Sequence, residues 1–166
     1  MRALMKPNPP EAQKKDSKLI YVLIAAAIVV IAIFLLAQNS HSGKEQITIT
    51  NSAGKQVNIY VEVADEWPEL QKGLMYRESL PEDEGMLFIF PQSGNYPFWM
   101  KNTLIALDAI YMDANGTIVD ILQMEPCISD PCTDYIPDAE ALYVLEVNKG
   151  FSERHGIKEG DRMMLK

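Results

Sequence analysis

One uncharged apolar segment constrains this chain more than any other feature. Residues 19–37 read LIYVLIAAAIVVIAIFLLA, without a charge, a proline or a glycine. As an α-helix the segment is about 28 Å long, close to the hydrocarbon thickness of a bilayer. Because a helix satisfies its own backbone hydrogen bonds in lipid, the sequence predicts a transmembrane anchor at residues 19–37 and a separate domain after it.

The distribution of charge predicts the orientation of this anchor. The chain carries 15 Lys or Arg and 23 Asp or Glu residues, a net charge of −8. Five of the basic and two of the acidic residues precede residue 38, so the N-terminal part is +3 and the remainder is −11. The positive-inside rule then predicts a single-pass membrane protein with a cytoplasmic basic tail at residues 1–18 and an extracytoplasmic C-terminal domain. The alternative, a cleaved secretory signal, is disfavoured because its apolar core is usually about 7–15 residues long.

The acidic balance also limits the partners of the domain. Nucleic acids and anionic membrane surfaces are bound through Lys and Arg side chains that contact phosphates. The net charge of −11 therefore predicts that the domain does not bind nucleic acid. The lipid bilayer, through residues 19–37, is the one partner that the sequence indicates directly.

After the anchor, the sequence predicts a tether at residues 38–45 and a single domain at residues 46–166. Alternating apolar residues predict a hairpin, strands 47–50 and 57–63 around a turn at 51–54. Shorter apolar runs predict further strands at 86–90, 109–112, 118–122, 142–147 and 162–165. Helical signals predict one short helix after Asp65, which would be its N-cap, and another at 151–155. The gaps are too short for repeated βαβ units. We therefore predict a compact, mostly β, α+β domain with an antiparallel barrel-like or sandwich-like sheet and one or two short helices.

The two cysteines predict a disulfide. Cys127 and Cys132 lie in PCISDPC, and an even cysteine count outside the membrane favours a bridge. A redox dithiol stays open as an alternative, although four residues separate the cysteines where C-x-x-C motifs have two. A metal site is disfavoured because zinc needs about four ligands and the histidines are His41, in the tether, and His155. We predict no metal and no cofactor.

The most unusual stretch is YPFWMKNT at residues 96–103, followed by Leu-Asp at 107–108. Here Trp99 stands close in sequence to Lys101, Asn102 and Asp108. An aromatic side chain edged by a cation, an amide and a carboxylate is typical of a site for a sugar-sized or polar organic ligand. The alternative is architectural: Trp99 packs in the core, and the polar side chains satisfy backbone groups in a tight corner.

These segments also carry a resemblance. In order along the chain, they resemble the signatures of the family catalogued as domain of unknown function 192: GLMYR at 73–77, GMLFIF at 85–90, FWMKNT at 98–103 and LD at 107–108. Similarity continues at 127–135, at VLE in 144–146 and at GIKEGD in 156–161, so it covers roughly residues 46–166. The run FWMKNT after GMLF is the most specific part.

The resemblance implies a small, mostly β domain behind a signal peptide or membrane anchor, in a family without an established activity. It also marks the polar and aromatic signature positions of this chain. These positions are our candidate ligand-binding residues: Arg77, Trp99, Lys101, Asn102 and Asp108.

Three functions fit these observations. The one we favour is a binding module that holds a polar small molecule, a glycan or another cell-envelope component near Trp99 and Asp108. The second is a structural or protein-interaction module without a ligand. The third is a hydrolase using Asp108 with Lys101 or Arg77, which is disfavoured because the chain has no G-x-S-x-G or phosphate-binding loop motif.

Overall fold

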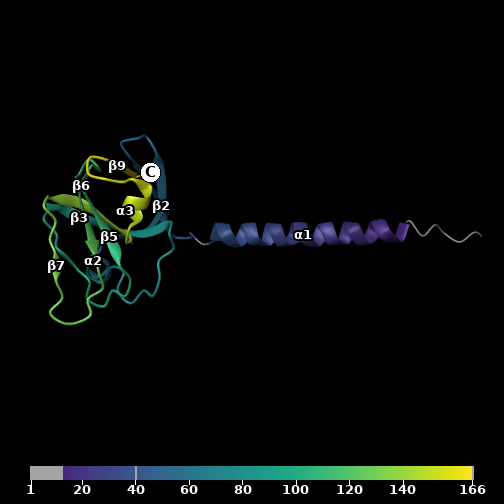
Figure 1. The fold of residues 1–166 in the computed structure, drawn as a ribbon, viewed down its shortest axis with the longest axis horizontal. Helices are drawn as coiled ribbons and strands as arrows, with labels where there is room; N and C mark the ends of the chain where they lie inside the picture. The colour runs from purple at the N-terminus through teal and green to yellow at the C-terminus, as the bar shows by residue number, and fades with distance from the viewer. Residues whose placement is uncertain (1–12, 40, 166) are drawn as a thin grey trace, which may run out of the picture. The chain divides into compact units, whose positions relative to one another are not determined.

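The computed structural model describes residues 13–39 and 41–165, which form two compact units divided after residue 42. The first unit contains helix α1, Gln13–Asn39, which begins before the predicted Leu19 and ends after the predicted Ala37 (Figure 1). Its side chains are described from residue 18 to residue 33, and all of these are exposed. Among the described residues, no helix combines the length and the apolar character that crossing a membrane requires.

Parts of the predicted topology fall outside this description. Residues 1–12 of the predicted cytoplasmic tail and residue 40 of the predicted tether lie outside the described residues. The side chains of residues 34–37, at the end of the predicted anchor, are also outside it. The cytoplasmic tail, the anchor and the tether therefore stay predictions.

The second unit is the β-rich α+β domain that the sequence predicts. Seven strands form one sheet in the order β6-β5-β8-β3-β2-β1-β9. They are β1 Glu45–Thr50, β2 Gln56–Ala64, β3 Glu84–Gly94, β5 Leu107–Met112, β6 Ile118–Met124, β8 Ala141–Asn148 and β9 Arg162–Leu165. A second sheet pairs two short strands, β4 Phe98–Trp99 and β7 Asp134–Tyr135.

The predicted N-terminal hairpin is confirmed. Ile47 lies opposite Ile59 and Ile49 lies opposite Val57 in an antiparallel pair. All four side chains are buried, as the two-residue period of apolar residues predicts. Gly54 takes a φ of 76° in the turn and donates its N–H to the carbonyl of Asn51, a conformation that glycine adopts without strain.

One strand pair departs from the antiparallel pattern. β2 and β3 run parallel, while the other neighbouring strands of the seven-stranded sheet are antiparallel. The connection between β2 and β3 contains helix α2, Trp67–Lys72. The helix is capped by Glu66 rather than by the predicted Asp65, and it ends at Gly73, whose φ is 47°. Because parallel strands need a long crossover, residues 65–83 lie over the sheet instead of forming a tight turn.

The sheet curls until its two ends meet. Thr117, beside β6, forms an isolated bridge with Arg162 of β9. Backbone hydrogen bonds extend the junction, from Met163 to Gly116 at 2.8 Å and from Ile118 to Asp161 at 2.9 Å. The predicted barrel-like form is thus realised as a curled sheet that is joined at one end.

The two faces of this sheet bury separate apolar cores. The first core includes residues of strands throughout the sheet and Phe151 of helix α3, Phe151–His155. Its largest members are Ile47, Ile49, Ile59, Leu87, Ile110, Met112, Leu145 and Phe151. The second core lies on the opposite face and includes Leu74, Leu80, Phe88, Met100, Leu107, Tyr111 and Val144. Residues that alternate along β3, β5 and β8 contribute in turn to one core and then to the other.

Candidate functional site

A cavity of about 520 Å³ opens beside the second core. Its lining comes from α2 and the residues that follow it, from β3, from the segment around β4, and from β8. Six aromatic side chains contribute: Trp67, Phe88, Phe90, Tyr96, Phe98 and Trp99. A concave, largely aromatic lining with few polar groups is the usual character of a small-molecule site.

The two tryptophans of the chain both line this cavity. Trp67 is 68% exposed and Trp99 is 49% exposed. A tryptophan recruited for core packing is normally well covered, because it is the largest apolar side chain. Trp99 is therefore not a core residue, in contrast to its neighbour Met100, which is 1% exposed.

The inner aromatic rings hold one another in fixed orientations. Phe88 and Phe98 pack edge to face with ring centroids 5.0 Å apart, and Phe90 stacks on Tyr96 with nearly parallel rings. Phe98 also packs edge to face against the buried Tyr111. The edge-to-face geometries are favourable ones for aromatic pairs, and together with the stacked pair they form this side of the cavity before any ligand arrives.

Glu146 is the buried acid of this cavity. It lies on β8 between Met86 of β3 and Ala109 of β5, on the face of the second core, and it is 5% exposed. Among the described residues, its carboxyl has no hydrogen-bond or ion-pair partner, and burial raises its pKa to about 8. Native proteins rarely bury a carboxyl group without a partner, because losing its hydration is unfavourable.

Gly73 brings the main chain against this carboxyl group. A Cβ atom placed on Gly73 would lie 3.1 Å from Cζ of Phe88 and 3.7 Å from Oε2 of Glu146. With its positive φ as well, the position suits glycine and resists larger residues. The end of α2 can therefore pack directly over the acid and the aromatic ring.

The structure places Asp108 away from the cavity. It lies on β5 opposite Val147, on the face of the first core, and it is completely buried. Its Oδ1 accepts the N–H of Gly150 and its Oδ2 accepts the N–H of Ser152, both at 3.0 Å. Asp108 thus satisfies backbone donors at the start of α3, the position where a carboxylate stabilises a helix.

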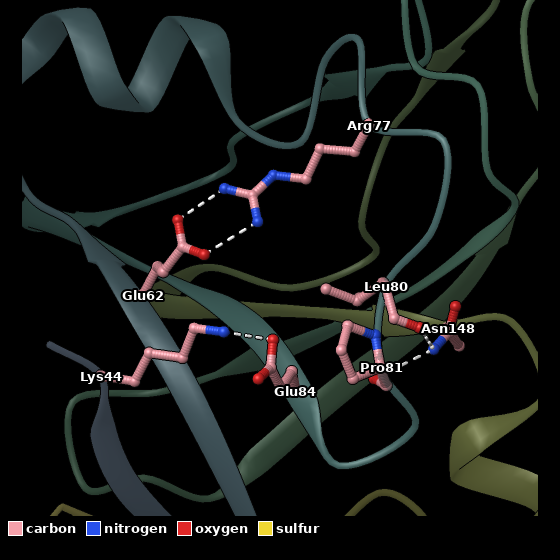
Figure 2. Close-up of polar contacts among 7 residues, drawn as sticks. All are labelled: Lys44, Glu62, Arg77, Leu80, Pro81, Glu84 and Asn148. Atoms are coloured by element: carbon pink, nitrogen blue, oxygen red, sulfur yellow. Dashed lines mark hydrogen bonds and ion pairs between the residues drawn. The ribbon is translucent and has the colours of Figure 1, made fainter. Parts of the chain in front are cut away.

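Arg77 is engaged in a bidentate ion pair. Its two terminal nitrogens donate to the two carboxylate oxygens of Glu62 on β2, at 2.8 and 2.5 Å (Figure 2). The hydrogen bond from Arg77 lowers the pKa of Glu62 and raises that of Arg77. The same figure shows Asn148 donating its side-chain amide to the carbonyls of Leu80 and Pro81. Both interactions fasten the crossover between β2 and β3 to the sheet.

Lys101 and Asn102 lie in the corner that follows Trp99. The Lys101 ammonium is 3.2 Å from the Asp130 carboxylate and 5.8 Å from the centroid of the Trp99 ring. Asn102 has a φ of 58°, and its carbonyl accepts the N–H of Tyr76, whose φ is 64°. A hydrogen bond between two residues with positive φ thus joins the signature segments at 73–77 and 98–103.

The structure also joins Cys127 and Cys132 in the predicted disulfide, with their Cα atoms 5.5 Å apart. The loop that they close precedes β7, whose Asp134 and Tyr135 pair with Trp99 and Phe98 of β4. The Lys101–Asp130 contact adds a second attachment. The disulfide loop therefore supports the strand that carries two aromatic residues of the cavity.

Of the five candidate residues, Trp99 lines the cavity, and the other four do not belong to its lining. Sequence reasoning missed Glu146 and Trp67. A signal for each is visible in the sequence: Glu146 interrupts an apolar strand, and Trp67 begins a short helix that also contains charged and amide side chains. The signal was indirect, because the sequence does not show that both residues approach Trp99.

The comparisons with known proteins agree with the signature segments. The model of the family DUF192, described as an uncharacterized ACR, matches residues 48–165. A UPF0127 protein of Pyrococcus furiosus is 26% identical over 115 residues, which cover 66% of this chain and 90% of the relative. A UPF0127 protein of Pyrococcus horikoshii is 28% identical over 108 residues, covering 62% of this chain and 84% of the relative.

Two crystal structures share the fold with a TM-score of 0.67. One is a Sinorhizobium meliloti protein provisionally described as a transcription regulator, 34% identical, with 74% of this chain and 93% of that chain covered. The other is a Novosphingobium aromaticivorans protein of unknown function, 33% identical, with 73% and 84% covered. With the family match over most of its length, the chain belongs to the DUF192 family.

Proposed function

We propose that this DUF192 protein is a small-molecule-binding module held at the outer surface of a membrane. The observation that carries the binding proposal is the convergence on one cavity of two exposed tryptophans and a buried carboxyl group that has no partner in the described part of the chain. Each feature disfavours the folded state on its own. A ligand that covers the rings and pairs with the carboxyl group would offset both.

The membrane part of the proposal rests on the apolar segment and on the charge pattern. The described side chains of α1 include large apolar residues that are more than half exposed, among them Leu19, Val22 and Ile31. A helix that is apolar on all sides is normally covered by protein or by lipid. If lipid covers it, the +3 head and the −11 remainder favour a cytoplasmic N-terminus.

Protease treatment of spheroplasts that contain the full chain tests this orientation. We expect the domain that begins near residue 43 to be digested from outside while a fragment containing α1 survives. Protection of the domain in sealed spheroplasts, with digestion after lysis, would contradict the proposed location and leave the cavity unaffected as a site.

Nucleic-acid binding, which the description of the Sinorhizobium meliloti protein brings to mind, is not our proposal for this chain. The remainder after residue 37 carries ten basic and 21 acidic residues. Phosphate contacts require clustered Lys and Arg, and three basic side chains of the domain, Arg77, Lys101 and Lys149, are already paired with acids.

A ligand panel tests the binding proposal independently of ligand class. The full chain in a polyoxyethylene detergent, which offers neither a sugar nor an ammonium group, is titrated with choline, 3,3-dimethylbutan-1-ol, glucose, N-acetylglucosamine and acetate. Because Trp67 and Trp99 both line the cavity, binding there should change the intrinsic fluorescence. A ligand of the native state should also raise the melting temperature.

Trp99→Ala provides the control for location. We expect it to weaken the binding of an active probe at least tenfold, while Trp67 still reports and the melting temperature changes little. If no probe gives a saturable change, or if Trp99→Ala binds as the parent does, the cavity is not the site. The architectural alternative would then be favoured, since Asp108, Arg77 and Asn102 all make internal contacts.

A further inference from the structure

We infer that the cavity takes an organic ammonium ion, with Glu146 as its counter-ion and the exposed tryptophans as its walls. This inference rests on the proposed binding function and names the class of ligand. Its basis is the geometry already described: an almost completely buried acid without a partner among the residues that the structure describes, and aromatic rings on α2, β3 and β4 that face the same space.

The composition of the lining favours a cation over a sugar. A sugar presents several hydroxyl groups, each of which needs a donor or an acceptor. Besides Glu146 and the indole N–H groups of the tryptophans, the polar side chains of the lining are Thr103, which is buried, Gln71 and Lys72, which are exposed, and Tyr96, whose hydroxyl group already donates to the carbonyl of Gln92. An organic ammonium ion needs one acid and the faces of aromatic rings, whose negative electrostatic potential attracts cations. The cavity offers that combination.

One aromatic ring of the cavity, that of Trp99, already lies beside an ammonium group. The ammonium group of Lys101 lies 5.8 Å from the centroid of Trp99, within the range of a cation–π contact. Lys101 does not belong to the cavity lining, and its charge is also paired with Asp130. The net charge of −11 after residue 37 would further raise the local concentration of cations.

The groups that face Glu146 predict how binding depends on pH. Lys72 of α2 lines the cavity on its exposed side, Tyr111 of β5 lies in the second core, and the β3 neighbours Met86 and Phe88 do not titrate. Burial raises the pKa of Glu146 to about 8 and, with Glu146 as a lesser cause, also raises the pKa of Tyr111. At pH 6 the carboxyl group is thus mostly protonated, and it must lose its proton to pair with a cation.

Affinity for a permanently charged ammonium ion should therefore rise with pH. Apparent affinity scales with the fraction of protein in the competent form. With a pKa of about 8, the deprotonated fraction grows roughly 50- to 100-fold between pH 6 and pH 9. Choline carries the same charge over this range, so the change reports the protein.

The test compares choline with 3,3-dimethylbutan-1-ol, its uncharged carbon isostere, on the full chain in a polyoxyethylene detergent. Tryptophan fluorescence is followed at pH 6, 7.5 and 9 at constant ionic strength. We expect choline to bind at least tenfold more tightly than the alcohol at pH 9 and to lose most of this advantage at pH 6. Glu146→Gln should abolish the advantage at every pH.

Matched variants distinguish binding that depends on Glu146 from a general attraction of cations to the negatively charged domain. Glu140→Gln removes one exposed acid and should change choline affinity less than twofold. Lys72→Gln removes the cation at the cavity and should strengthen choline binding a few fold. Equal binding of choline and the alcohol would overturn the ammonium assignment while leaving the cavity as a site. A choline affinity that is independent of pH, or unchanged in Glu146→Gln, would also overturn it, and failure of every probe would reject the proposed function itself.

Discussion

Asp108 and Glu146 are buried acids on neighbouring strands, one residue apart in register, and they have opposite surroundings. Asp108 lies opposite Val147 on the face of the first core, while Glu146 lies opposite Ala109 on the face of the second. Both carboxylate oxygens of Asp108 accept backbone N–H groups at the start of α3. The carboxyl group of Glu146 has no partner among the described residues and faces a cavity.

The difference shows how a buried charge can be assigned to folding or to function. An acid whose oxygens are satisfied by the backbone stabilises the fold, because the donors would otherwise be unpaired. A buried acid without a partner destabilises the fold and is expected where function requires it. By this criterion we interpret the Asp108 region as architectural and the Glu146 region as the proposed site.

The largest effect is expected at Asp108. Asp108→Asn replaces an acceptor oxygen with an amide nitrogen that faces a backbone N–H, so one hydrogen bond is lost and the charge that strengthens the other is removed. We expect a loss of about 3–5 kcal/mol in the free energy of unfolding, measured by urea denaturation at pH 7. Asp134→Asn, at an exposed position, should change stability by less than about 0.5 kcal/mol. A loss of choline binding in Asp108→Asn without a loss of stability would reverse the assignment.

Glu146→Gln should raise the free energy of unfolding, in contrast to Asp108→Asn, which should lower it. Because burial raises the pKa of Glu146 to about 8, the unfolded chain releases this proton at lower pH than the folded chain does. Stability therefore falls as pH rises from the usual carboxyl range to about 8, and the Gln variant avoids this fall. We expect the variant to be about 2–4 kcal/mol more stable than the parent at pH 9, with little difference at pH 4. A destabilised variant at pH 9 would show that the carboxyl group supports the fold.

The disulfide should affect both stability and ligand binding, because its loop supports the cavity strand β4. Replacing both Cys127 and Cys132 with Ser should lower the free energy of unfolding by about 2 kcal/mol, the chain-entropy value for so short a loop. Choline affinity should fall as well, since β7 and the Lys101–Asp130 contact position Trp99. Intact mass before and after reduction confirms the bond in the parent, and two free thiols in native protein would refute it.

The Arg77–Glu62 ion pair should contribute less to the free energy of unfolding than the disulfide does. Both side chains are about one-third exposed, so solvent screens the pair. A double-mutant cycle with Arg77→Gln and Glu62→Gln should give a coupling of about 0.5–1 kcal/mol. Because the pKa of Glu62 is lowered, the coupling should be complete above the usual carboxyl range and should vanish as pH falls below it. A coupling that persists in strong acid would contradict an ionic origin.

A small effect on stability, comparable with that of the ion pair, is expected at Trp99. Its ring is 49% exposed, so Trp99→Ala should cost about 1 kcal/mol or less, below the 3–5 kcal/mol of a core tryptophan. Ligand affinity should nevertheless fall at least tenfold. A loss of several kcal/mol of stability would instead place Trp99 with Asp108 in the architecture.

The sequence predicted local structure well because the hairpin and the strands depend on neighbouring residues. Alternation along 57–63 sets the buried face of β2. The parallel β2–β3 pair was missed because its partners meet across a crossover of many residues. A sequence pattern does not record which distant strands become neighbours.

The same limit explains the candidate site. Trp99 and Asp108 are close in sequence, but β5 directs Asp108 and its neighbour Leu107 to opposite faces. Glu146 and Trp67 are far from Trp99 in sequence, yet α2 and β8 bring both to its cavity. Of the predicted pair, Trp99 therefore lies at the proposed site and Asp108 does not. The acid of the proposed site is Glu146, which comes from β8.

The most direct test of the account counts the protons released when choline binds. Calorimetric titrations of the full chain at pH 7, in two buffers with different ionisation enthalpies, give this number. If Glu146 is a buried acid that pairs with an ammonium ion, close to one proton should leave per choline bound at pH 7, and almost none should leave above pH 9 or in Glu146→Gln. Binding of choline at pH 7 without proton release would contradict the account.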